Sequence, residues 1–391
     1  MEADPNAVER GKITQATNAW IPQVLTKRPY WISGILILAI LLVVWSSNGT
    51  STLKTIRWVK TYLEGQGKVC KPEPMHFGLR KPCPGLPIRP DTILYLVMGK
   101  SFPNASWIKK SRWENVSLHF QAWKLNVTEK MLPLTGKTLR WSFFPHSTWT
   151  TGRNKQIQEA YNWEMDQGWK FEFFVFFDED VYLSYRSPEN PSVSVWQGSD
   201  EHAMKRFNKL LLQDRPFRAG ISFNDHTNAD YNWSRTNFGC ERRCGVDNVV
   251  VAMHRTGVEL LLPYQTELDS FSWWMSAYLN NLMAAVLAPR FCNFYREVMV
   301  EVGWQNHGSY LRGEYYELAE ETFLDCLISH NYTGFADMDS GEAISKIRHG
   351  LGPSVADANR KCVKHPAGVD FRTLLQDQLE NWVVTCLPIK H

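Results

Sequence analysis

The stretch Phe171-Glu172-Phe173-Phe174-Val175-Phe176-Phe177-Asp178-Glu179-Asp180 decides the fold class that we expect for this chain. Five of its first seven residues are aromatic and one more is β-branched, which is typical of a strand buried on both faces in a parallel sheet. Three carboxylates follow where this strand leaves the core, and open α/β sheets bind ligands outside the carboxyl ends of their strands. The stretch therefore indicates an acidic site. It serves either a divalent cation held against a phosphorylated ligand or acid–base chemistry.

The sequence before this stretch predicts a strand–helix–strand unit. A short apolar run at 92–98 ends in Gly99, and a second run covers 138–144, so both predict strands. The region between these runs, through residue 125, predicts surface helix and loop. A helix then precedes the acidic stretch and stops at Gly168, with one apolar face made by Ile157, Ala160, Tyr161 and Met165. A strand, a helix and an acid-tipped strand in this order form a βαβ unit, which implies a parallel sheet.

Alternation of helices and strands continues downstream. A helix opens at Ser199-Asp200, and a second helix covers 270–288. Strands are expected at 217–223, 248–253 and 296–302, and the tail from about residue 337 is expected to be helical in part. The predicted fold class is α/β, with a mixed and mostly parallel sheet.

Composition narrows the function classes. The chain has 391 residues, of which 44% are hydrophobic and 13% aromatic, so global disorder is excluded. The net charge is only +3 and no basic block stands out, which excludes the electrostatic footprint of a nucleic-acid-binding protein. Seventeen Trp and fourteen Tyr fit core and membrane-interface use, or stacking on sugars and other planar ligands.

An uncharged segment near the amino terminus predicts a membrane anchor. No charged residue occurs from Pro29 to Leu53, and Trp31 and Trp45 bracket an almost continuous apolar run. With its polar flanks the run approaches the about 20 residues that a spanning helix needs. A cleaved signal peptide is the alternative. It is disfavoured because 28 residues precede the run and no small-x-small cleavage site follows. We therefore predict an uncleaved signal anchor at 30–47.

Glycosylation sequons and cysteines favour one orientation of this anchor. Positively charged residues flank both ends of the anchor, so charge alone does not determine its orientation in the membrane. All Asn-x-Ser/Thr sequons lie beyond the anchor, as do all eight cysteines, which suits a non-cytosolic segment with disulfides. The predicted acceptor asparagines are Asn104, Asn115, Asn126, Asn232 and Asn331, with a further sequon at Asn48. The prediction is a type II membrane protein.

The chain then divides into a cytosolic tail (1–29), the anchor (30–47), a Pro-rich stem (48–90) and a lumenal domain (91–391). The stem contains Cys70 and Cys83, which we expect to form a disulfide. The lumenal domain is expected to have a first half at 91–183 and a second half with a carboxyl-terminal tail at 184–391.

Together, a type II anchor, a Pro-rich stem, a βαβ unit and a hydrophobic strand ending in Asp178-Glu179-Asp180 resemble a Golgi glycosyltransferase of the GT-A fold. The resemblance covers about residues 91–300 and the anchor. It implies a single Rossmann-like lumenal domain in the Golgi membrane system. It also implies a nucleotide-sugar donor, a glycan or glycoconjugate acceptor, and Mn²⁺ or Mg²⁺ as cofactor. Asp178 and Asp180 would bind the metal, and Glu179 has the variable middle place.

The resemblance also suggests further site residues. Thr150, Thr151 and Gly152 precede the helix, and Arg153 could pair with a donor phosphate and Asn154 with ribose or base. The alternative for this segment is an ordinary helix amino terminus. In the second half, Asp269 is the first candidate for a catalytic base and Glu267 the second. Either Asp269 or its neighbour could instead cap a helix. Other candidate bases are Asp225, Asp230 and Asp247.

A late histidine often completes the metal site in this family. His307 is the candidate here, and the competing histidines are His330, His349 and His365. Cys240-Glu-Arg-Arg-Cys244 has no second cysteine pair, so a short disulfide loop or two separate bridges are favoured over a metal.

Two other functions compete with a glycosyltransferase. The second is a non-catalytic type II glycan-binding protein, which the tryptophan content fits equally well. The third is a lumenal metallohydrolase, which is disfavoured because no second acid/His cluster is evident.

Overall fold

The structure of the chain is a computed structural model, which describes residues 85–101, 103, 105–126, 132–179, 181–185, 200–223, 240–242, 244, 249–266, 273–302 and 362–376. The strands of this part are β1 (Ile88–Gly99), β2 (Val116–Ala122), β3 (Leu139–Phe143), β4 (Lys170–Asp178), β5 (Val181–Tyr185), β6 (Arg218–Phe223), β7 (Cys240–Glu241), β8 (Val250–His254) and β9 (Cys292–Val302). The α-helices are α3 (Ala105–Lys110), α5 (Trp149–Gln167), α6 (Asp200–Asp214), α8 (Arg255–Leu261), α9 (Trp273–Leu287) and α12 (Phe371–Leu374), and a 3₁₀ turn, η2, covers Leu132–Leu134.

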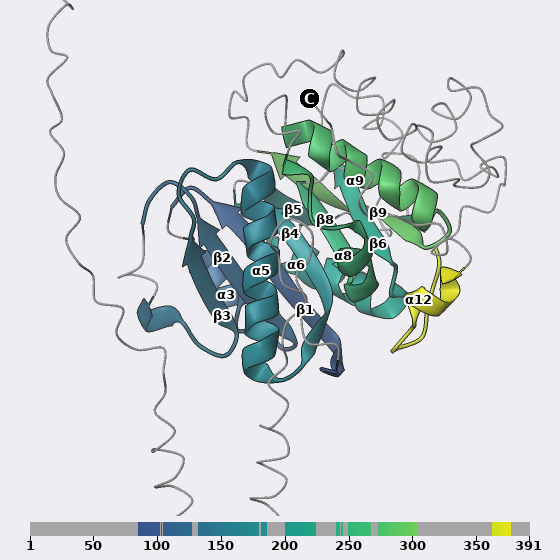
Figure 1. The fold of residues 1–391 in the computed structure, drawn as a ribbon, viewed down its shortest axis with the longest axis horizontal. Coiled ribbons are helices and arrows are strands. Elements are labelled where there is room, and N and C mark those ends of the chain that lie inside the picture. Colours follow the sequence, from purple (N-terminus) through teal and green to yellow (C-terminus); the bar gives the residue numbers. More distant parts are fainter. Residues whose placement is uncertain are drawn as a thin grey trace, which may run out of the picture. The chain divides into compact units, whose positions relative to one another are not determined.

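The described strands form one mixed sheet in the order β3-β2-β1-β4-β8-β6-β9-β5, with β7 paired to β9 (Figure 1). The four strands β3, β2, β1 and β4 pair in parallel. Strand β8 is antiparallel to β4 and β6, whereas β6 and β9 are parallel. Strands β5 and β7 are antiparallel to β9. Six strands thus point one way and three the other, which confirms the predicted mixed, mostly parallel α/β sheet.

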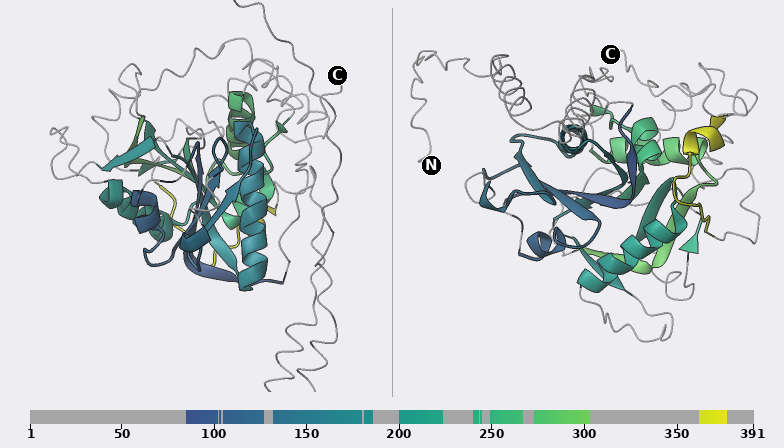
Figure 2. Two further views of the ribbon diagram at one scale, coloured as in Figure 1. Left: turned by 90° about the vertical axis from the view of Figure 1, so that its left-hand side faces the viewer. Right: turned by 90° about the horizontal axis from the view of Figure 1, so that it is seen from below.

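Helices cover both faces of this sheet. Figure 2 shows the sheet between α5 on one side and α3 with α6 on the other. The buried side chains divide in the same way: Leu94, Leu96 and Phe176 pack with α5, α8 and α9, whereas Tyr95 and Phe177 pack on the side of α3 and α6. Phe173 to Phe177 of β4 alternate between these two cores, and residues 171–177 have no exposed surface except at Glu172, which is 2% exposed. The predicted doubly buried strand is therefore confirmed.

Both ends of α5 are fixed by local hydrogen bonds. Thr148 accepts from the backbone N–H of Thr151 at 3.1 Å, and the Thr151 hydroxyl accepts from the backbone N–H of Thr148 at 2.9 Å, which is a capping box. Gly168 ends the helix with a φ of 78°, a conformation that favours glycine. The stop at Gly168 is confirmed. The predicted start is corrected, because Thr150, Thr151 and Gly152 lie inside the first turn rather than before the helix.

Strand β2 corrects the expectation of surface helix and loop before residue 125. All seven of its residues are buried, next to β1 on one side and β3 on the other. Polar residues alternate with apolar ones because Leu118 and Phe120 enter the core of α3 and α6, which leaves His119 and Gln121 on the side of α5. Because its second face is polar, this strand lacks the continuous apolar run that would have predicted it from the sequence.

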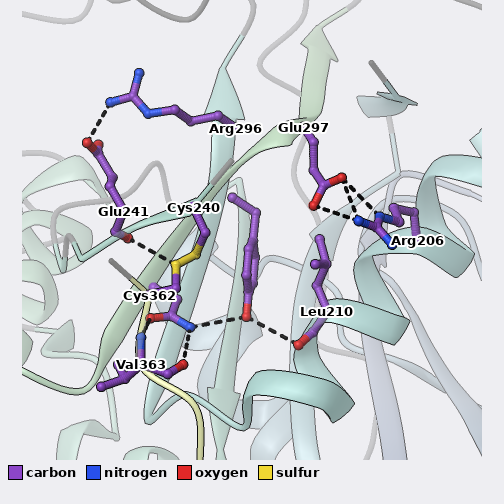
Figure 3. Close-up of a disulfide and its surroundings, with 10 residues drawn as sticks. Arg206, Leu210, Cys240, Glu241, Arg296, Glu297, Cys362 and Val363 are labelled. Atoms are coloured by element: carbon purple, nitrogen blue, oxygen red, sulfur yellow. Dashed lines mark hydrogen bonds and ion pairs between the residues drawn. A yellow bond between two sulfur atoms is a disulfide. The ribbon is translucent and has the colours of Figure 1, made fainter. Parts of the chain in front are cut away.

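Among the described residues, two disulfides tie the second half of the domain together. Cys244 is bonded to Cys292, and Cys240 to Cys362. Of the predicted alternatives for Cys240 and Cys244, two separate bridges are confirmed. Figure 3 shows the Cys240–Cys362 bridge, with the ion pair of Glu241 and Arg296 (2.6 Å) close by.

The segment 362–376 is held at further points. The Asn293 side chain donates to the Val363 carbonyl at 3.0 Å and accepts from its N–H at 3.1 Å. The Phe371 ring packs against Phe217 and Phe291, with ring centres 5.5 and 5.8 Å away. The carboxyl-terminal segment is therefore an integral part of this core, as expected from Cys362.

Within the described ranges, no helix has both the length and the hydrophobicity needed to cross a bilayer. The predicted anchor at 30–47 and most of the predicted stem lie outside these ranges.

Candidate functional site

The carboxyl ends of β1 and β4 meet at a point where the chain changes direction across the sheet. From β1 the chain proceeds outward to β2 and β3, and it then returns through α5 to the other side of β1 as β4. Such a switch point opens a crevice beyond the strand ends, where open α/β sheets bind ligands. Met98 of β1 is paired with Asp178 of β4 at this edge. Asp178 thus lies at the strand end where the sequence predicted it.

Glu179 joins the two strand ends. Its backbone N–H donates to the Met98 carbonyl at 3.1 Å, and its carboxylate Oε1 accepts from the Lys100 N–H at 2.5 Å. A Cβ on Gly99 would overlap the Glu179 carboxylate and lie 2.7 Å from the Phe120 ring, so only glycine fits there without displacement. Glu179, which the sequence left without a role, therefore fixes the loop that leaves β1.

Arg153 of α5 reaches the acidic tip from the helix side. Its Nη2 donates to Asp178 Oδ1, and its Nη1 donates to the Leu96 carbonyl at 3.2 Å. Arg153 has no exposed surface, whereas the Asp178 side chain is 19% exposed. A side chain without exposed surface cannot reach a dissolved phosphate, so the predicted phosphate contact is not available to Arg153 in this conformation. Arg153 instead holds the carboxylate that faces outward.

Asn154 holds a segment of the second half. Its amide donates to the Tyr264 carbonyl at 2.8 Å and accepts from the Tyr264 N–H at 2.8 Å. The ring of Tyr264 packs edge-on against Trp149, with centres 5.1 Å apart. Both polar groups of Asn154 are occupied by backbone, so in this structure the residue connects α5 to the segment after α8 rather than presenting its amide to ribose or base.

Tyr264 extends from this segment toward the buried charges. Its hydroxyl has no hydrogen-bond partner in the described part of the chain, and burial raises its pKa. The charges of Arg218 and Arg153 lower this pKa, and that of Asp178 raises it. The sequence did not single out Tyr264, and no local pattern would have identified it.

A buried polar cluster lies between β2 and α5. His119, Gln121 and Gln156 are at most 2% exposed. Gln121 donates to the Gly152 carbonyl at 3.1 Å, but both ring nitrogens of His119 and both amide atoms of Gln156 lack a partner among the described residues. Burial lowers the pKa of His119 to about 4, so its ring is neutral near pH 7. Buried polar groups of this kind are commonly satisfied by internal water.

Several predicted site residues lie outside the described ranges. They are Asp180, Glu267, Asp269 and His307, together with Asp225, Asp230, Asp247, His330 and His349. Of the sequon asparagines, Asn115 and Asn126 are exposed, whereas Asn104, Asn232 and Asn331 lie outside. The structure therefore brings together Asp178, Arg153 and the strand-end loop, and the remaining assignments stay predictions.

A second group of possible metal-ligand atoms lies near the carboxyl end of α6. Asp214, Cys240 and Cys362 have ligand atoms within 4.8 Å of one another. The two sulfurs are bonded to each other, so neither is a thiolate that could bind a metal. His365 lies beside this group, since its N–H donates to the Asp214 carbonyl at 2.9 Å. Asp214 adjoins Arg215, which contacts Glu172 near the start of β4, so His365 lies away from Asp178.

Comparisons with known proteins gave matches only in structure. No protein-family model matches the chain, and no curated protein matches it in sequence. A solved structure from Desulfovibrio desulfuricans G20, provisionally named a nucleotide-diphospho-sugar transferase, has 12% identity and a TM-score of 0.28. The alignment covers 62% of this chain and 98% of that one.

Two further structures are similar at the same level. One is a glycosyltransferase involved in glycosylation of the major capsid of PBCV-1, with 13% identity, a TM-score of 0.21 and coverage of 46% of this chain and 68% of that one. The other is the glycosyltransferase GlyE of Streptococcus pneumoniae TIGR4, with 7% identity, a TM-score of 0.22 and coverage of 71% and 66%. Because all three TM-scores are low, the function proposed next rests on the chain's own geometry.

Proposed function

We propose that this chain is a glycosyltransferase. It transfers a sugar from a nucleotide-sugar donor to a glycan or glycoconjugate, with Mn²⁺ or Mg²⁺ bound at Asp178. One observation carries the proposal: a partly exposed carboxylate lies at the carboxyl end of β4, beside β1, at the switch point of the parallel half of the sheet. In α/β folds this is the edge where nucleotide ligands bind.

The side chains at this edge suit a hard divalent cation and a phosphorylated ligand. Carboxylate oxygens are the preferred ligands of Mn²⁺ and Mg²⁺. Asp178 provides one of the three predicted ligands, and Asp180 and His307 are proposed as the other two. A bound cation would neutralise charge on the donor diphosphate and so stabilise the departing nucleotide.

The amino end of α5 opens at the same edge. Trp149 and Thr150 lie in its first turn, and the positive end of a helix dipole attracts anions. Because Gly99 has no side chain, the loop after β1 can pass close to the Glu179 carboxylate. The helix end favours a diphosphate over a neutral ligand.

In this proposal the second half of the lumenal domain (184–391) binds the acceptor and supplies the group that takes its proton. Asp269 remains the first candidate base and Glu267 the second. They follow the segment 264–266, which Asn154 fixes against α5. The base would take the proton of the acceptor hydroxyl as the sugar transfers.

We further propose that the chain is a type II protein of the Golgi membrane, with residues 30–47 as anchor and the described domain in the lumen. Support comes from the uncharged segment, from the sequons and from two disulfides, which persist in secretory compartments. Glycosidase treatment of the cellular protein tests the orientation: a size shift that Asn115→Gln and Asn126→Gln reduce is expected. A chain without glycans would contradict it.

Donor hydrolysis and transfer test the enzymatic proposal. The full-length chain, purified in detergent, is incubated with UDP- and GDP-sugars and an acceptor glycan mixture, and release of UDP or GDP is measured with Mn²⁺ and with a chelator. We expect release that depends on metal and is lost in Asp178→Asn. A chain that binds glycans, ignores every nucleotide and is unaffected by chelation would instead be the glycan-binding protein.

A further inference from the structure

Arg153 is a fully buried cation at the edge of the candidate site. It has no exposed surface, and its two terminal nitrogens bind groups from two strands: the Leu96 carbonyl of β1 and the Asp178 carboxylate of β4. Its Cζ lies 5.2 Å from the ring centre of Trp149 and 5.4 Å from that of Phe176. The guanidinium is therefore fixed by two hydrogen bonds and two aromatic rings.

These contacts bear on the carboxylate rather than on a ligand. Asp178 is the last residue of β4, and its side chain is 19% exposed. Without a fixed partner, a carboxylate at the end of a strand would rotate freely, and a bound cation would have to order it. The contact from Arg153 is made to Oδ1, from a donor that is itself held by the Leu96 carbonyl at 3.2 Å. The carboxylate is thus ordered by the protein.

We propose that Arg153 is a positioning residue: it holds the Asp178 carboxylate in the orientation that binds the divalent cation. This inference rests on the proposed function. Groups that hydrogen-bond to metal ligands commonly contribute about 10–100-fold to metal affinity or activity. Arginine suits this position because its rigid planar fork donates to two acceptors at once, which a lysine ammonium on a flexible stem does not reproduce.

Two effects of the guanidinium oppose each other. Its positive charge repels a divalent cation, so its removal alone would tighten metal binding. Its hydrogen bond orders Asp178, so its removal would weaken metal binding. The proposal requires the second effect to be larger. The direction of the change in an uncharged variant therefore decides between positioning and a merely structural ion pair.

The chain offers matched variants. Arg153→Met removes the charge and both hydrogen bonds, and Arg153→Lys keeps the charge without the planar fork. Asn154→Ala is the control, because it removes two hydrogen bonds from the adjacent residue of α5 and touches Tyr264 but not Asp178. Asp178→Asn reports on the cation site itself. Circular dichroism establishes that each variant is folded.

The experiment measures Mn²⁺ binding to the full-length chain by electron paramagnetic resonance, with UDP or GDP present as the nucleoside diphosphate. We expect Arg153→Met to bind Mn²⁺ about 10–100-fold more weakly than wild type, Arg153→Lys to weaken by about tenfold, and Asn154→Ala to bind as wild type. At saturating Mn²⁺, kcat of the Arg153 variants should recover, because the cation then orders the carboxylate. Should Arg153→Met not fold, Arg153→Gln, which is also uncharged, carries the same test.

Wild-type or tighter Mn²⁺ affinity in the folded Arg153 variants would overturn the inference and leave the proposed function standing. Wild-type affinity in Asp178→Asn, or no Mn²⁺ binding in the wild-type chain, would overturn the proposed function and this inference with it. Equal weakening in Asn154→Ala and Arg153→Met would also overturn the inference, since it would show a general disturbance of α5.

Discussion

Strand β4 carries an arginine–carboxylate contact at each end, and the two ends differ in exposure. Near the amino end, Glu172 contacts Arg215 at 2.9 Å, and the two side chains are 2% and 8% exposed. At the carboxyl end, Asp178 contacts Arg153, and the two are 19% and 0% exposed. The arginines are similarly buried, so the difference lies in the acids.

The hydrogen bonds of Glu172 account for its burial. At Glu172 the protein uses both carboxylate oxygens: Arg215 donates to Oε1, and the Asp91 N–H donates to Oε2 at 2.6 Å. Burial raises the pKa of Glu172, and its surroundings leave no approach for a ligand. At Asp178 the carboxylate reaches the surface beside Gly99 and the start of α5. The same type of pair thus serves stability at the amino end and, in our proposal, a ligand at the carboxyl end.

Removing the charge at the carboxyl end should have the largest effect on activity. Asp178→Asn keeps an oxygen acceptor for Arg153 but loses the anionic ligand. We expect transfer to fall by at least about 100-fold, because a bound cation supplies several kcal/mol and each 1.4 kcal/mol is tenfold in rate. Nucleoside diphosphate release measures this. Unchanged nucleoside diphosphate release by a folded Asp178→Asn variant would contradict the ligand role proposed for the carboxyl end of β4.

The equivalent change at the amino end should affect stability instead. Glu172→Ala leaves Nη1 of Arg215 and the Asp91 N–H without their buried acceptor, while Nη2 of Arg215 keeps the more exposed Asp91 carboxylate. Breaking such a buried pair costs about 3–5 kcal/mol. Denaturant unfolding should show this loss, while activity and Mn²⁺ affinity per folded molecule stay at the wild-type level. A large change in Mn²⁺ affinity would mean that the amino end also controls the site.

A third prediction concerns pH and the polar cluster on β2. The pKa of His119 is lowered from 6.5 to about 4, chiefly by burial; the charge of Glu159 opposes this shift, and those of Lys155 and Arg140 add to it. Between these values the unfolded chain binds the proton and the folded chain does not. Above pH 6.5 the ring is neutral in both states, and the folded state keeps its full stability. As the pH falls toward 4, the unfolded chain binds the proton first, so the free energy of unfolding falls. The contribution is about 3 kcal/mol, at 1.36 kcal/mol for each pH unit of the shift.

Comparing His119→Gln with wild type isolates this contribution, because His254, whose pKa burial also lowers to about 4, is present in both. The free energy of unfolding, measured from pH 7 to pH 4, should fall less steeply in the variant. Parallel curves would contradict a neutral buried ring at position 119.

The smallest expected effect concerns the helix that carries Arg153. Thr148→Ala removes the amino-terminal cap of α5 and should lower stability by about 1 kcal/mol, whereas Thr148→Ser should keep the cap. Thermal unfolding of the two variants measures the difference. Equal unfolding temperatures would show that the capping box contributes nothing to α5.

The fold could be predicted where one physical signal dominated. The apolar run of β4, followed by acids, identified both the parallel sheet and the strand end at which Asp178 lies. The run at 92–98 identified β1, and Gly168 identified the end of α5. Strand β2 escaped because Ser117, His119 and Gln121 face α5 and break the apolar pattern.

The site could be predicted less completely, because its contacts join residues that are distant in sequence. Arg153 and Asp178 are 25 positions apart, and Asn154 and Tyr264 are 110 apart. The resemblance to GT-A glycosyltransferases suggested that Arg153 and Asn154 would meet the donor. Their burial and pairing give them positions inside the protein instead. Glu179 was set aside as a variable residue, yet its carboxylate fixes the loop after β1, which no local sequence pattern specifies.

The central claim is that Asp178 binds the divalent cation at the switch point between β1 and β4. The most direct measurement is anomalous X-ray scattering from manganese in crystals of the chain grown with Mn²⁺ and UDP or GDP. We predict a manganese peak in contact with the Asp178 carboxylate and the diphosphate. A bound nucleotide with no manganese at Asp178, or a manganese peak at Asp214 instead, would contradict the claim.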